Sequence, residues 1–315
     1  MEKNMKENFE KLERRVFDTL NNTDLKKINY ELSRINGPTL ISGVGGSSVV
    51  SEYASKILSQ KNRIITRNTE PRDFKYMDSN LYENVLACSY SGNNYGVDLA
   101  FDNKLRHYLL ASKPNEQDSV INLTYNNCED KEKSFISLAA TLIPCSVLLN
   151  YYINNEWYRI IDDLESYDFN FDTNCDAYEI FSGFDTSTAS KYLESTMVES
   201  GIGIPIIHDK YSFCHGRSTL STVSNNIAIY FDTGTELDKL LLDELYKYYK
   251  YVVVLNKGKI GTYVLGYKID LFREYLLLVE CMYLTKYIAE SKQKDLSGID
   301  YNPIVKKLYK YKGNI

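Results

Sequence analysis

The stretch Ser89-Tyr90-Ser91-Gly92-Asn93-Asn94 directly follows the apolar run Val85-Leu86-Ala87-Cys88. An earlier stretch, Gly43-Val44-Gly45-Gly46-Ser47-Ser48, follows Thr39-Leu40-Ile41 in the same way. Each pattern predicts a short buried strand, a Gly/Ser loop and the start of a helix. The first N–H groups of a helix have no partner within the helix and carry partial positive charge, and glycine lets the backbone approach an anion closely. Together the two loops predict a cradle for a phosphate group on an α/β sheet.

Short apolar stretches alternate with helical stretches over most of the chain. This alternation is typical of βαβ units, in which helices cover both faces of a parallel sheet. The expected strands are Thr39–Ser42, Arg63–Thr66, Val85–Ser89, His107–Ala111, Val120–Leu123, Tyr178–Ser182, Ile204–His208, Ile227–Phe231, Tyr251–Leu255 and Thr262–Gly266. The expected helices are 5–35, Ser48–Leu58, Tyr95–Phe101, Lys133–Ile153, Ser187–Glu199, Glu236–Tyr248 and Asp270–Ala289. We therefore expect an α/β protein with doubly wound parallel sheets.

A polar, acidic and Asn-rich segment, Glu165–Ala177, divides this pattern into two halves. We expect a first domain over residues 1–165, with an N-terminal helix and both Gly/Ser loops, and a second over residues 166–315, with a C-terminal tail. The halves have similar length and rhythm, which favours a tandem duplication. Where the first half has its Ser-x-Ser-Gly loop, the second has Ser182-Gly183-Phe184-Asp185. One ligand per chain is therefore expected.

The composition argues against several classes of protein. The 315 residues carry a net charge of −5, which is unsuited to a general nucleic-acid or membrane surface. The polar N-terminus lacks the apolar core of a signal peptide, and no run reaches the roughly 18 apolar residues of a membrane span. The six cysteines are scattered without a C-x-x-C pair, which favours reduced thiols over a disulfide framework or a zinc site. We expect a cytoplasmic protein that needs no metal or cofactor.

The two loops supply the candidate phosphate ligands. In a doubly wound sheet, ligands bind beyond the carboxyl ends of the strands, where neighbouring crossovers diverge. Serine hydroxyls and glycine N–H groups can donate hydrogen bonds there. The candidate phosphate- and sugar-binding residues are Gly46, Ser47, Ser48, Ser89, Ser91, Gly92 and Asn94. The alternative is a pair of ordinary strand-to-helix turns, in which Ser and Gly are common.

A carboxylate and an imidazole in the second half are the candidate catalytic groups. Glu199 ends an expected helix, and His215 lies in the polar loop Phe213-Cys214-His215-Gly216-Arg217. Such a pair can move a proton between adjacent carbons and open a sugar ring. Arg217 could bind a ligand anion through its bidentate guanidinium. The alternatives are a helix-terminal glutamate, a surface histidine and a solvated arginine.

The stretches Gly43–Ser48 and Ser89–Asn94 together resemble the phosphosugar-binding loops of the sugar isomerase (SIS) family. The resemblance covers essentially the whole chain after the N-terminal helix. The tandem arrangement is similar to the isomerase half of glutamine–fructose-6-phosphate aminotransferase and to the fructosamine-6-phosphate deglycases. It implies two SIS domains, a phosphorylated sugar or amino sugar as ligand, and a homodimer with the site near the subunit interface.

The same resemblance implies roles for individual residues. The phosphate would be held by Ser47, Ser89, Ser91 and Asn94. In the family a glutamate on a helix precedes a His-Gly pair, and here Glu199 lies sixteen residues before His215, which is the family's spacing. Glu199 would be the base that moves a proton between C1 and C2. His215 would assist ring opening, reaching the site of a neighbouring subunit. The tail over 298–309 is similar to the family's C-terminal segment, which folds over the ligand.

The chain departs from the aminotransferase pattern in three respects. Thr196 stands where the aminotransferase has a lysine, three residues before its glutamate. The lysine of the family's tail also lies at a different spacing from the proline than Lys306 or Lys307 here. We expect no N-terminal glutaminase domain to supply ammonia from glutamine, and so we do not expect aminotransferase activity. Isomerisation, deglycation and deamination of a sugar phosphate all stay open.

Two alternatives come from other classes of protein. The first is a phosphosugar-binding sensor or regulatory protein without turnover, which Thr196 and the degenerate second loop favour. The second is a nucleotide-binding Rossmann enzyme, prompted by Gly43-Val44-Gly45-Gly46. That motif requires a third glycine where Ser48 stands, and a ribose-binding acid about 20 residues later is missing, although Arg67 keeps an NADP variant open.

Overall fold

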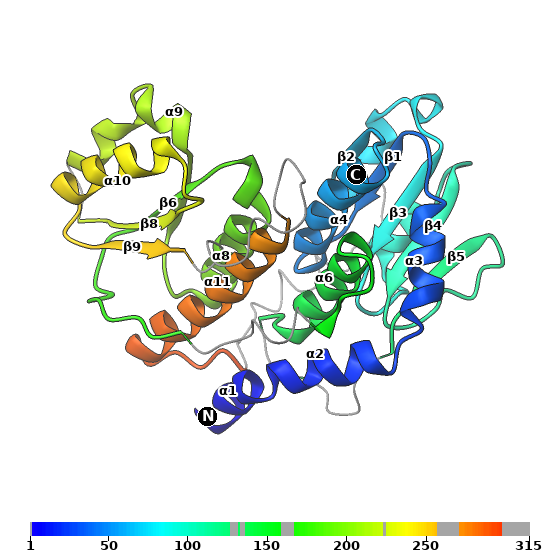
Figure 1. Cartoon of the computed structure of the whole chain (residues 1–315), viewed down its shortest axis with the longest axis horizontal. Helices are drawn as coiled ribbons and strands as arrows, with labels where there is room; N and C mark the ends of the chain where they lie inside the picture. The colour runs from blue at the N-terminus through cyan, green and yellow to red at the C-terminus, as the bar shows by residue number, and fades with distance from the viewer. Residues whose placement is uncertain are drawn as a thin grey trace. The chain divides into compact units, whose positions relative to one another are not determined.

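The computed structural model describes residues 2–126, 132, 136–158, 167–222, 225–256 and 271–297. The chain forms two compact units (Figure 1). The first runs to Trp157 and includes residues 295–297, and the second is Tyr158–Lys294. Each unit is built on one parallel sheet flanked by helices, which confirms the expected α/β class. The domain boundary expected after residue 165 falls within 159–166, outside the described residues, and stays a prediction.

The sheet of the first unit has five parallel strands in the order β2-β1-β3-β4-β5. Both β1 and β3 are buried along their whole length, which explains why their sequences are almost continuously apolar. Ser42, the last residue of β1, pairs with Ala87 near the end of β3. The strands are β1 Thr39–Ser42, β2 Thr66–Asn68, β3 Asn84–Cys88, β4 Arg106–Ala111 and β5 Val120–Thr124.

Helices pack on this sheet directly after β1 and β3. Helix α4 (Ser47–Lys61) follows β1 and packs against α6 (Ala139–Tyr152), as Figure 1 shows. Helix α5 (Tyr95–Ala100) follows β3 and packs with the short 3-10 helix η1 (Pro71–Tyr76). The side chains between the sheet and the face that carries α5 and η1 are buried and apolar, and they include Leu40, Val85, Ala87, Val97, Ala100 and Leu109.

The N-terminal segment differs from the single helix expected over 5–35. It forms three helices, α1 (Glu2–Glu10), α2 (Leu12–Asn21) and α3 (Leu25–Ser33). The break before α3 has a local cause, because the Asp24 carboxylate accepts a hydrogen bond from the Lys27 N–H at 3.0 Å and so caps a new helix. The apolar stripe keeps its helical spacing across the first break, so the sequence pattern did not reveal it.

Strand β2 also begins later than expected, at Thr66 rather than at Arg63. Arg63 has a φ of 57°, in the left-handed region, where a strand cannot continue. The end of α4 and the start of β2 are therefore separated by a turn rather than joined directly.

The second unit repeats the strand order of the first with four strands, β7-β6-β8-β9. Helix α8 (Ser187–Ser200) packs along α11 (Leu271–Ser291), and α10 (Glu236–Tyr248) covers a cluster that includes Phe181 and Tyr230. The strands are β6 Tyr178–Ser182, β7 Pro205–Asp209, β8 Ile227–Phe231 and β9 Val252–Leu255. The strand expected at Thr262–Gly266 and the tail over 298–315 lie outside the described residues.

Candidate functional site

The two Gly/Ser loops leave the first sheet side by side. They follow β1 and β3, which are neighbouring parallel strands, and the last residue of β1 pairs with Ala87 near the end of β3. In the sheet, β2 lies next to β1 on one side and β3 lies next to β1 on the other. The connections of the chain therefore diverge between β1 and β3, which is the switch point of the topology. A methyl group added to Gly96 would lie 2.7 Å from Val44 Cγ2, so the first loop touches the start of α5. Ligands of doubly wound sheets bind at such a switch point.

The loop after β3 is held by its own residues. Ser89 is only 3% exposed, and its Oγ accepts hydrogen bonds from the Gly92 N–H at 3.2 Å and from Asn94 Nδ2 at 2.9 Å. Asn94 in turn caps α5, because its Oδ1 accepts the Val97 N–H at 3.1 Å. Gly92 has a φ of +75°, and a Cβ there would lie 2.4 Å from the Lys113 carbonyl oxygen, so only glycine fits.

These bonds decide which donors of the second loop are available to a ligand. A serine hydroxyl accepts up to two hydrogen bonds and donates one. Ser89 Oγ already accepts two, and its own proton has no acceptor within the described ranges. Ser91 is exposed, and its hydroxyl makes no hydrogen bond to any described residue. The Gly92 N–H, expected to face the phosphate, is engaged with Ser89 instead.

The loop after β1 has a tighter backbone. Gly45 has a φ of +59°, and a Cβ on Gly43 would lie 2.1 Å from the Ser47 carbonyl oxygen. The N–H groups of Ser47 and Ser48 donate to the carbonyls of Val44 and Gly45, at 3.2 and 2.9 Å. The half-buried hydroxyls of Ser47 and Ser48 make no hydrogen bond to the part of the chain that the structure describes. The hydroxyls, rather than these two amides, are therefore the donors left for a ligand.

Helix α6 and the residues just before it bring two further hydroxyls to the first loop, and sequence reasoning missed both. A Cβ on Gly46 would lie 3.1 Å from Ser137 Oγ and 3.5 Å from Thr141 Oγ1. Thr141 Oγ1 is buried without a partner among the described residues, and so is the Oγ of Ser42 at the end of β1. Buried hydroxyls are normally paired, so two orphans beside one loop indicate a site completed by a ligand or by water.

Glu132 is a third residue that sequence reasoning missed. Its carboxylate oxygens accept the N–H groups of Leu138 at 2.8 Å and Ala140 at 3.2 Å, at the start of α6. Burial raises the pKa of this carboxyl, and the hydrogen bonds from the two N–H groups oppose the rise. Ser137 and Thr141 lie about 90 residues beyond the first loop in a stretch without a Gly/Ser motif, so only the tertiary fold brings them to Gly46, and Glu132 holds the backbone next to them.

Glu199 lies in the last turn of α8, in the second unit. The residue is exposed overall, and Ser195 Oγ donates to its Oε1 at 3.1 Å. Partial desolvation of the carboxyl raises its pKa above the ordinary value, the bond from Ser195 opposes this rise, and the charge of Glu194 adds to it. A carboxylate with a raised pKa is a better proton acceptor near neutral pH.

His215 and Arg217 follow the short helix α9 (Lys210–Cys214), and both are exposed. Arg217 Nη1 donates to the Ile207 carbonyl oxygen of β7 at 3.5 Å, a long bond to the chain's own backbone. No hydrogen bond or ion pair joins Glu199 to His215 in the described ranges. The structure therefore does not bring these two expected catalytic groups together as a pair within one unit.

Carboxylates of the chain itself occupy the equivalent helix starts of the second unit. The Thr188 N–H at the start of α8 donates to Glu274 Oε1 at 2.7 Å. After β8, the N–H groups of Thr233 and Thr235 both donate to Asp238 Oδ2 at 3.0 Å. Asp238 is 1% exposed and also forms a buried ion pair with Lys210 at 2.5 Å. The second half thus lacks the Ser-x-Ser-Gly motif, and carboxylates of its own side chains accept the N–H groups next to the switch point between β6 and β8.

Among the described residues, no group of three or more His, Cys, Asp or Glu side chains lies close enough together to hold a metal ion. No described helix combines the length and the apolar character that crossing a membrane requires.

No protein-family model and no curated protein matches the sequence. Solved structures do match the fold over nearly their whole length. The tagatose-6-phosphate ketose/aldose isomerase of Escherichia coli is 14% identical with a TM-score of 0.70, over 94% of this chain and 96% of that chain. The C-terminal domain of the glucosamine-fructose-6-phosphate aminotransferase of Francisella tularensis is 13% identical with a TM-score of 0.70, over 93% and 97%. The glucosamine-6-phosphate deaminase of Thermotoga maritima is 17% identical with a TM-score of 0.65, over 91% and 96%.

These matches concern the fold. At such identities they show that the chain shares the fold of these structures, with two parallel α/β sheets flanked by helices, and a shared fold does not define an activity.

Proposed function

We propose that this protein binds a phosphorylated sugar or amino sugar at the two serine loops of the first unit and acts on it as a phosphosugar isomerase-type enzyme. The observation that carries the proposal is the hydroxyl of Ser89 at the switch point. Its lone pairs are used by Gly92 and Asn94, so its proton is left to donate to an anion. A phosphate is the anion suited to several hydroxyl donors at once.

The surroundings of Ser89 support a phosphate as the ligand. The hydroxyls of Ser47, Ser48 and Ser91 are further donors on the two neighbouring loops. The starts of α4 and α5 contribute partial positive charge, which offsets part of the charge of a phosphate dianion. The buried hydroxyls of Ser42 and Thr141, at the same end of the sheet, have no hydrogen-bond partner among the described residues, so this region is polar and could accept or donate further hydrogen bonds. The named substrates of the structural matches, tagatose 6-phosphate among them, are sugar phosphates of this kind.

The proposed chemistry is a proton transfer beside a carbonyl or an imine. Glu199 would take the proton from one carbon and return it to the next, through an enediol or an enamine. Its raised pKa supports this role. His215 would assist ring opening from a neighbouring subunit, which fits its exposed position and the lack of a bond to Glu199. Isomerisation, deglycation and deamination all share this first step, and Arg217 is a candidate contact to the ligand's anion.

A homodimer is part of the proposal, and the edge of the second sheet supports it. Strand β7 is an edge strand, and apolar side chains on it and directly before it are exposed: Ile204 by 65% and Ile207 by 39%. An exposed apolar edge strand is a template for association with another chain. His215 follows β7 by a few residues, so a second copy docked here would bring one subunit's histidine close to the other subunit.

The second candidate function is a phosphosugar sensor without turnover, and Thr196 favours it. Its Oγ1 donates to the Tyr192 carbonyl at 2.9 Å and lies 3.3 Å from Thr285 Oγ1 of α11. The residue is 4% exposed, so the position where the related enzymes would place a lysine is packed between two helices. This arrangement supplies no amine for catalysis.

One experiment separates the two candidates. The protein is incubated with fructose 6-phosphate, glucosamine 6-phosphate and other hexose and amino-sugar phosphates, and the mixtures are followed by ¹H and ³¹P NMR. A new sugar phosphate, or released ammonia or amine, supports the enzyme. Line broadening of a ligand without any product supports the sensor. Failure of every sugar phosphate to bind would contradict both.

A further inference from the structure

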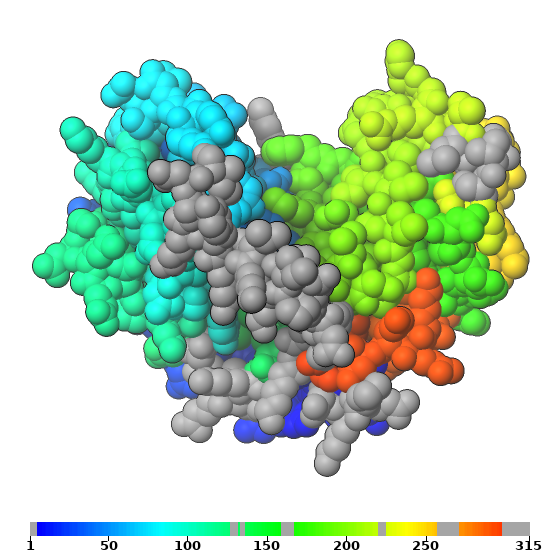
Figure 2. Space-filling view, turned by 180° about the vertical axis from the view of Figure 1, so that it is seen from behind, coloured from blue at the N-terminus to red at the C-terminus, as the bar shows by residue number. Residues whose placement is uncertain are grey.

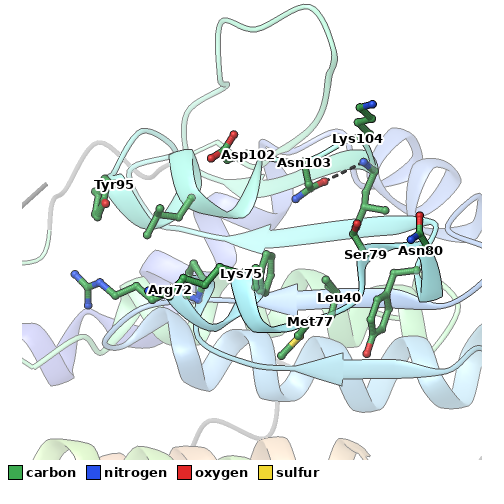
Figure 3. Close-up of a pocket in the computed structure, with 15 residues that line it drawn as sticks. Leu40, Arg72, Lys75, Met77, Ser79, Asn80, Tyr95, Asp102, Asn103 and Lys104 are labelled. Carbon is green, nitrogen blue, oxygen red and sulfur yellow. Dashed lines mark hydrogen bonds between the residues drawn. The ribbon is translucent and has the colours of Figure 1, made fainter. Parts of the chain in front are cut away.

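A pocket of about 940 Å³ lies on the first unit apart from the serine loops. Its walls come from residues 71–82 on one side and from α5 with the turn 102–105 on the other (Figure 3). The segment with η1 and η2 (Ser79–Leu81) is cyan in Figure 2 and lies on the surface of the molecule. None of the loop serines or glycines lines the pocket. Its lining therefore differs from that of the phosphate cradle, although Tyr95 at one end of the pocket directly follows Asn94.

The pocket exists because the helices on this face of the sheet are short. Helix α5 has six residues and spans about 9 Å, whereas the five-residue strand β3 beneath it spans about 16 Å. The connection from β2 to β3 contains two short 3-10 helices instead of a full α-helix. Apolar side chains that longer helices would cover, Leu40, Phe74 and Met77 among them, are left lining a cavity.

The charged side chains that line the pocket are mostly cations. Among the described residues they are Arg72, Lys75 and Lys104, against one acid, Asp102. Lys104 is exposed and forms no ion pair with any residue that the structure describes, and the Arg72 guanidinium lies 6.0 Å from the centre of the Tyr95 ring. Figure 3 shows Arg72 and Tyr95 at one end of the pocket and Lys104 at the other. On a chain with a net charge of −5, this excess of positive charge favours an anion.

The uncharged part of the lining favours a flat apolar body. The rings of Phe74, Tyr82 and Tyr95 and the side chains of Leu99 and Leu105 supply aromatic and aliphatic surface. Its volume falls within the range of about 300–1,000 Å³ that is typical of small-molecule sites. Ser79, Asn80 and Asn103 line the same pocket, so polar groups at the edge of a flat ligand would also find partners there.

We propose that this pocket is a second ligand site of the first unit, for a small anion with a flat, apolar or aromatic body. The cations hold the charge at the rim, and the aromatic and leucine side chains pack against the body. The proposal is independent of the phosphosugar proposal, because the two sites share no residue.

The test uses 8-anilinonaphthalene-1-sulfonate, an anion with an aromatic body, as the probe. The full chain is labelled with ¹³C at its methionine methyl groups, and the probe is titrated. Met77 lines the pocket, whereas Met197 and Met282 are buried in the second unit at 0% exposure. The Met77 signal, assigned with Met77→Leu, is expected to shift saturably while the other two stay in place. A Met77 signal that does not move would overturn the proposal.

Charge variants test the second half of the claim. Lys104→Glu and Arg72→Glu are each expected to lower the affinity for the sulfonate probe about five-fold, because the attraction between a cation at the edge of the pocket and the sulfonate becomes a repulsion. The control Lys26→Glu changes an equally exposed lysine on α3 and is expected to leave the affinity unchanged. N-phenyl-1-naphthylamine, the same body without the sulfonate, is expected to bind more weakly and to respond to none of these variants.

A filling variant tests the cavity itself. Leu99→Trp places a larger ring in the pocket and is expected to abolish the Met77 shift, with thermal unfolding still cooperative. Equal affinities of the sulfonate probe for the protein and both charge variants would overturn the anion site. Undiminished binding to a folded Leu99→Trp protein would show that the probe binds elsewhere and would also overturn it.

Discussion

Asn94 Nδ2 donates a hydrogen bond to Ser89 Oγ at 2.9 Å, so the residue that caps helix α5 also fixes the hydroxyl that follows strand β3. The strand end and the helix start are thereby joined through side chains, across a loop of six residues. This relationship positions one donor at the switch point of the sheet before any ligand arrives, and preorganised donors reduce the entropy lost on binding.

Removal of the Ser91 hydroxyl is predicted to lower only the affinity for a phosphosugar, whereas removal of the Ser89 hydroxyl is predicted to lower the free energy of unfolding as well. Ser91→Ala should weaken fructose 6-phosphate binding about ten-fold without changing stability, because its hydroxyl makes no bond within the described chain. Ser89→Ala should weaken binding and also destabilise the protein by about 1–2 kcal/mol, because two donors lose their acceptor. Isothermal titration and urea unfolding check both. Ser59→Ala, an exposed serine on α4, is the control, and unchanged binding in Ser91→Ala would contradict the cradle.

The bond between Ser89 and Asn94 predicts energetic coupling. Asn94→Ala removes the cap of α5 and should cost about 1–2 kcal/mol of unfolding free energy. The double variant Ser89→Ala/Asn94→Ala should lose less than the sum of the single losses, by about 1 kcal/mol, since both remove the same bond. Urea unfolding of the four proteins in the cycle measures this difference. Strict additivity would show that the two side chains act independently.

Glu199→Gln is predicted to abolish turnover while leaving phosphosugar binding nearly intact. The carboxylate must be ionised to accept a proton, so kcat/KM of the parent protein should fall as pH drops through a pKa above the ordinary glutamate value. Glu194→Gln removes a like charge and should move this acidic limb to lower pH. Rates measured from pH 4 to 8 test both statements. Full activity of Glu199→Gln would refute the assignment of the base.

Asp238 predicts how the second unit responds to acid. Burial raises the pKa of this carboxyl, but the hydrogen bonds from Lys210, Tyr230 and the Thr235 N–H outweigh burial and hold the pKa well below its usual range. A depressed folded pKa gives stability that is fully present above the unfolded pKa of about 3.9 and is lost as pH falls below it.

Asp238→Asn is accordingly expected to cost about 3–5 kcal/mol at pH 7, because Lys210 stays buried without its partner. The difference from the parent protein should shrink between pH 5 and pH 2. Urea unfolding across this range measures it, with Asp243→Asn, an exposed position on the same helix, as the control. A difference that stays constant with pH would contradict the depressed pKa.

The edge strand β7 predicts the oligomeric state. Ile207→Glu should convert a dimer to a monomer in analytical ultracentrifugation, because a charge on an apolar interface is not solvated. Leu240→Glu alters a residue of α10 that is 59% exposed and lies away from β7, and it should leave the dimer intact. A parent protein that is already monomeric, or a dimer that survives Ile207→Glu, would contradict the proposed interface.

The sequence predicted the elements whose signals are local. The bounds of β1, β6, β8 and α10 agree with the structure, because each is a short apolar run or an amphipathic helix with a clear start. The single N-terminal helix was wrong, because the Asp24 cap interrupts a helical apolar stripe. The pairing of the two serine loops was also accessible, since parallel neighbouring strands end at the same edge.

The parts of the site that depend on tertiary contacts were not accessible. Ser137 and Thr141 reach Gly46 only because α6 packs on α4, and no spacing in the sequence records that contact. The engagement of the Gly92 N–H by Ser89 likewise depends on the loop's conformation, which Gly92 adopts at positive φ. The roles of Glu199, His215 and Arg217 stay predictions.

The internal carboxylates of the second unit have a consequence for how order varies across the chain. Glu274 and Asp238 are carboxylates of the chain itself, so the backbone N–H groups that they accept stay hydrogen-bonded at every concentration of metabolite. Within the described chain no carboxylate bonds to the serine loops of the first unit, so we expect these loops to become more ordered when a sugar phosphate binds. Amide hydrogen exchange should therefore slow with ligand near Gly46 and Ser91 and stay constant near Thr188 and Thr235. The order of the backbone would then depend on the concentration of sugar phosphate at the first sheet and not at the second, although both sheets have the same strand order.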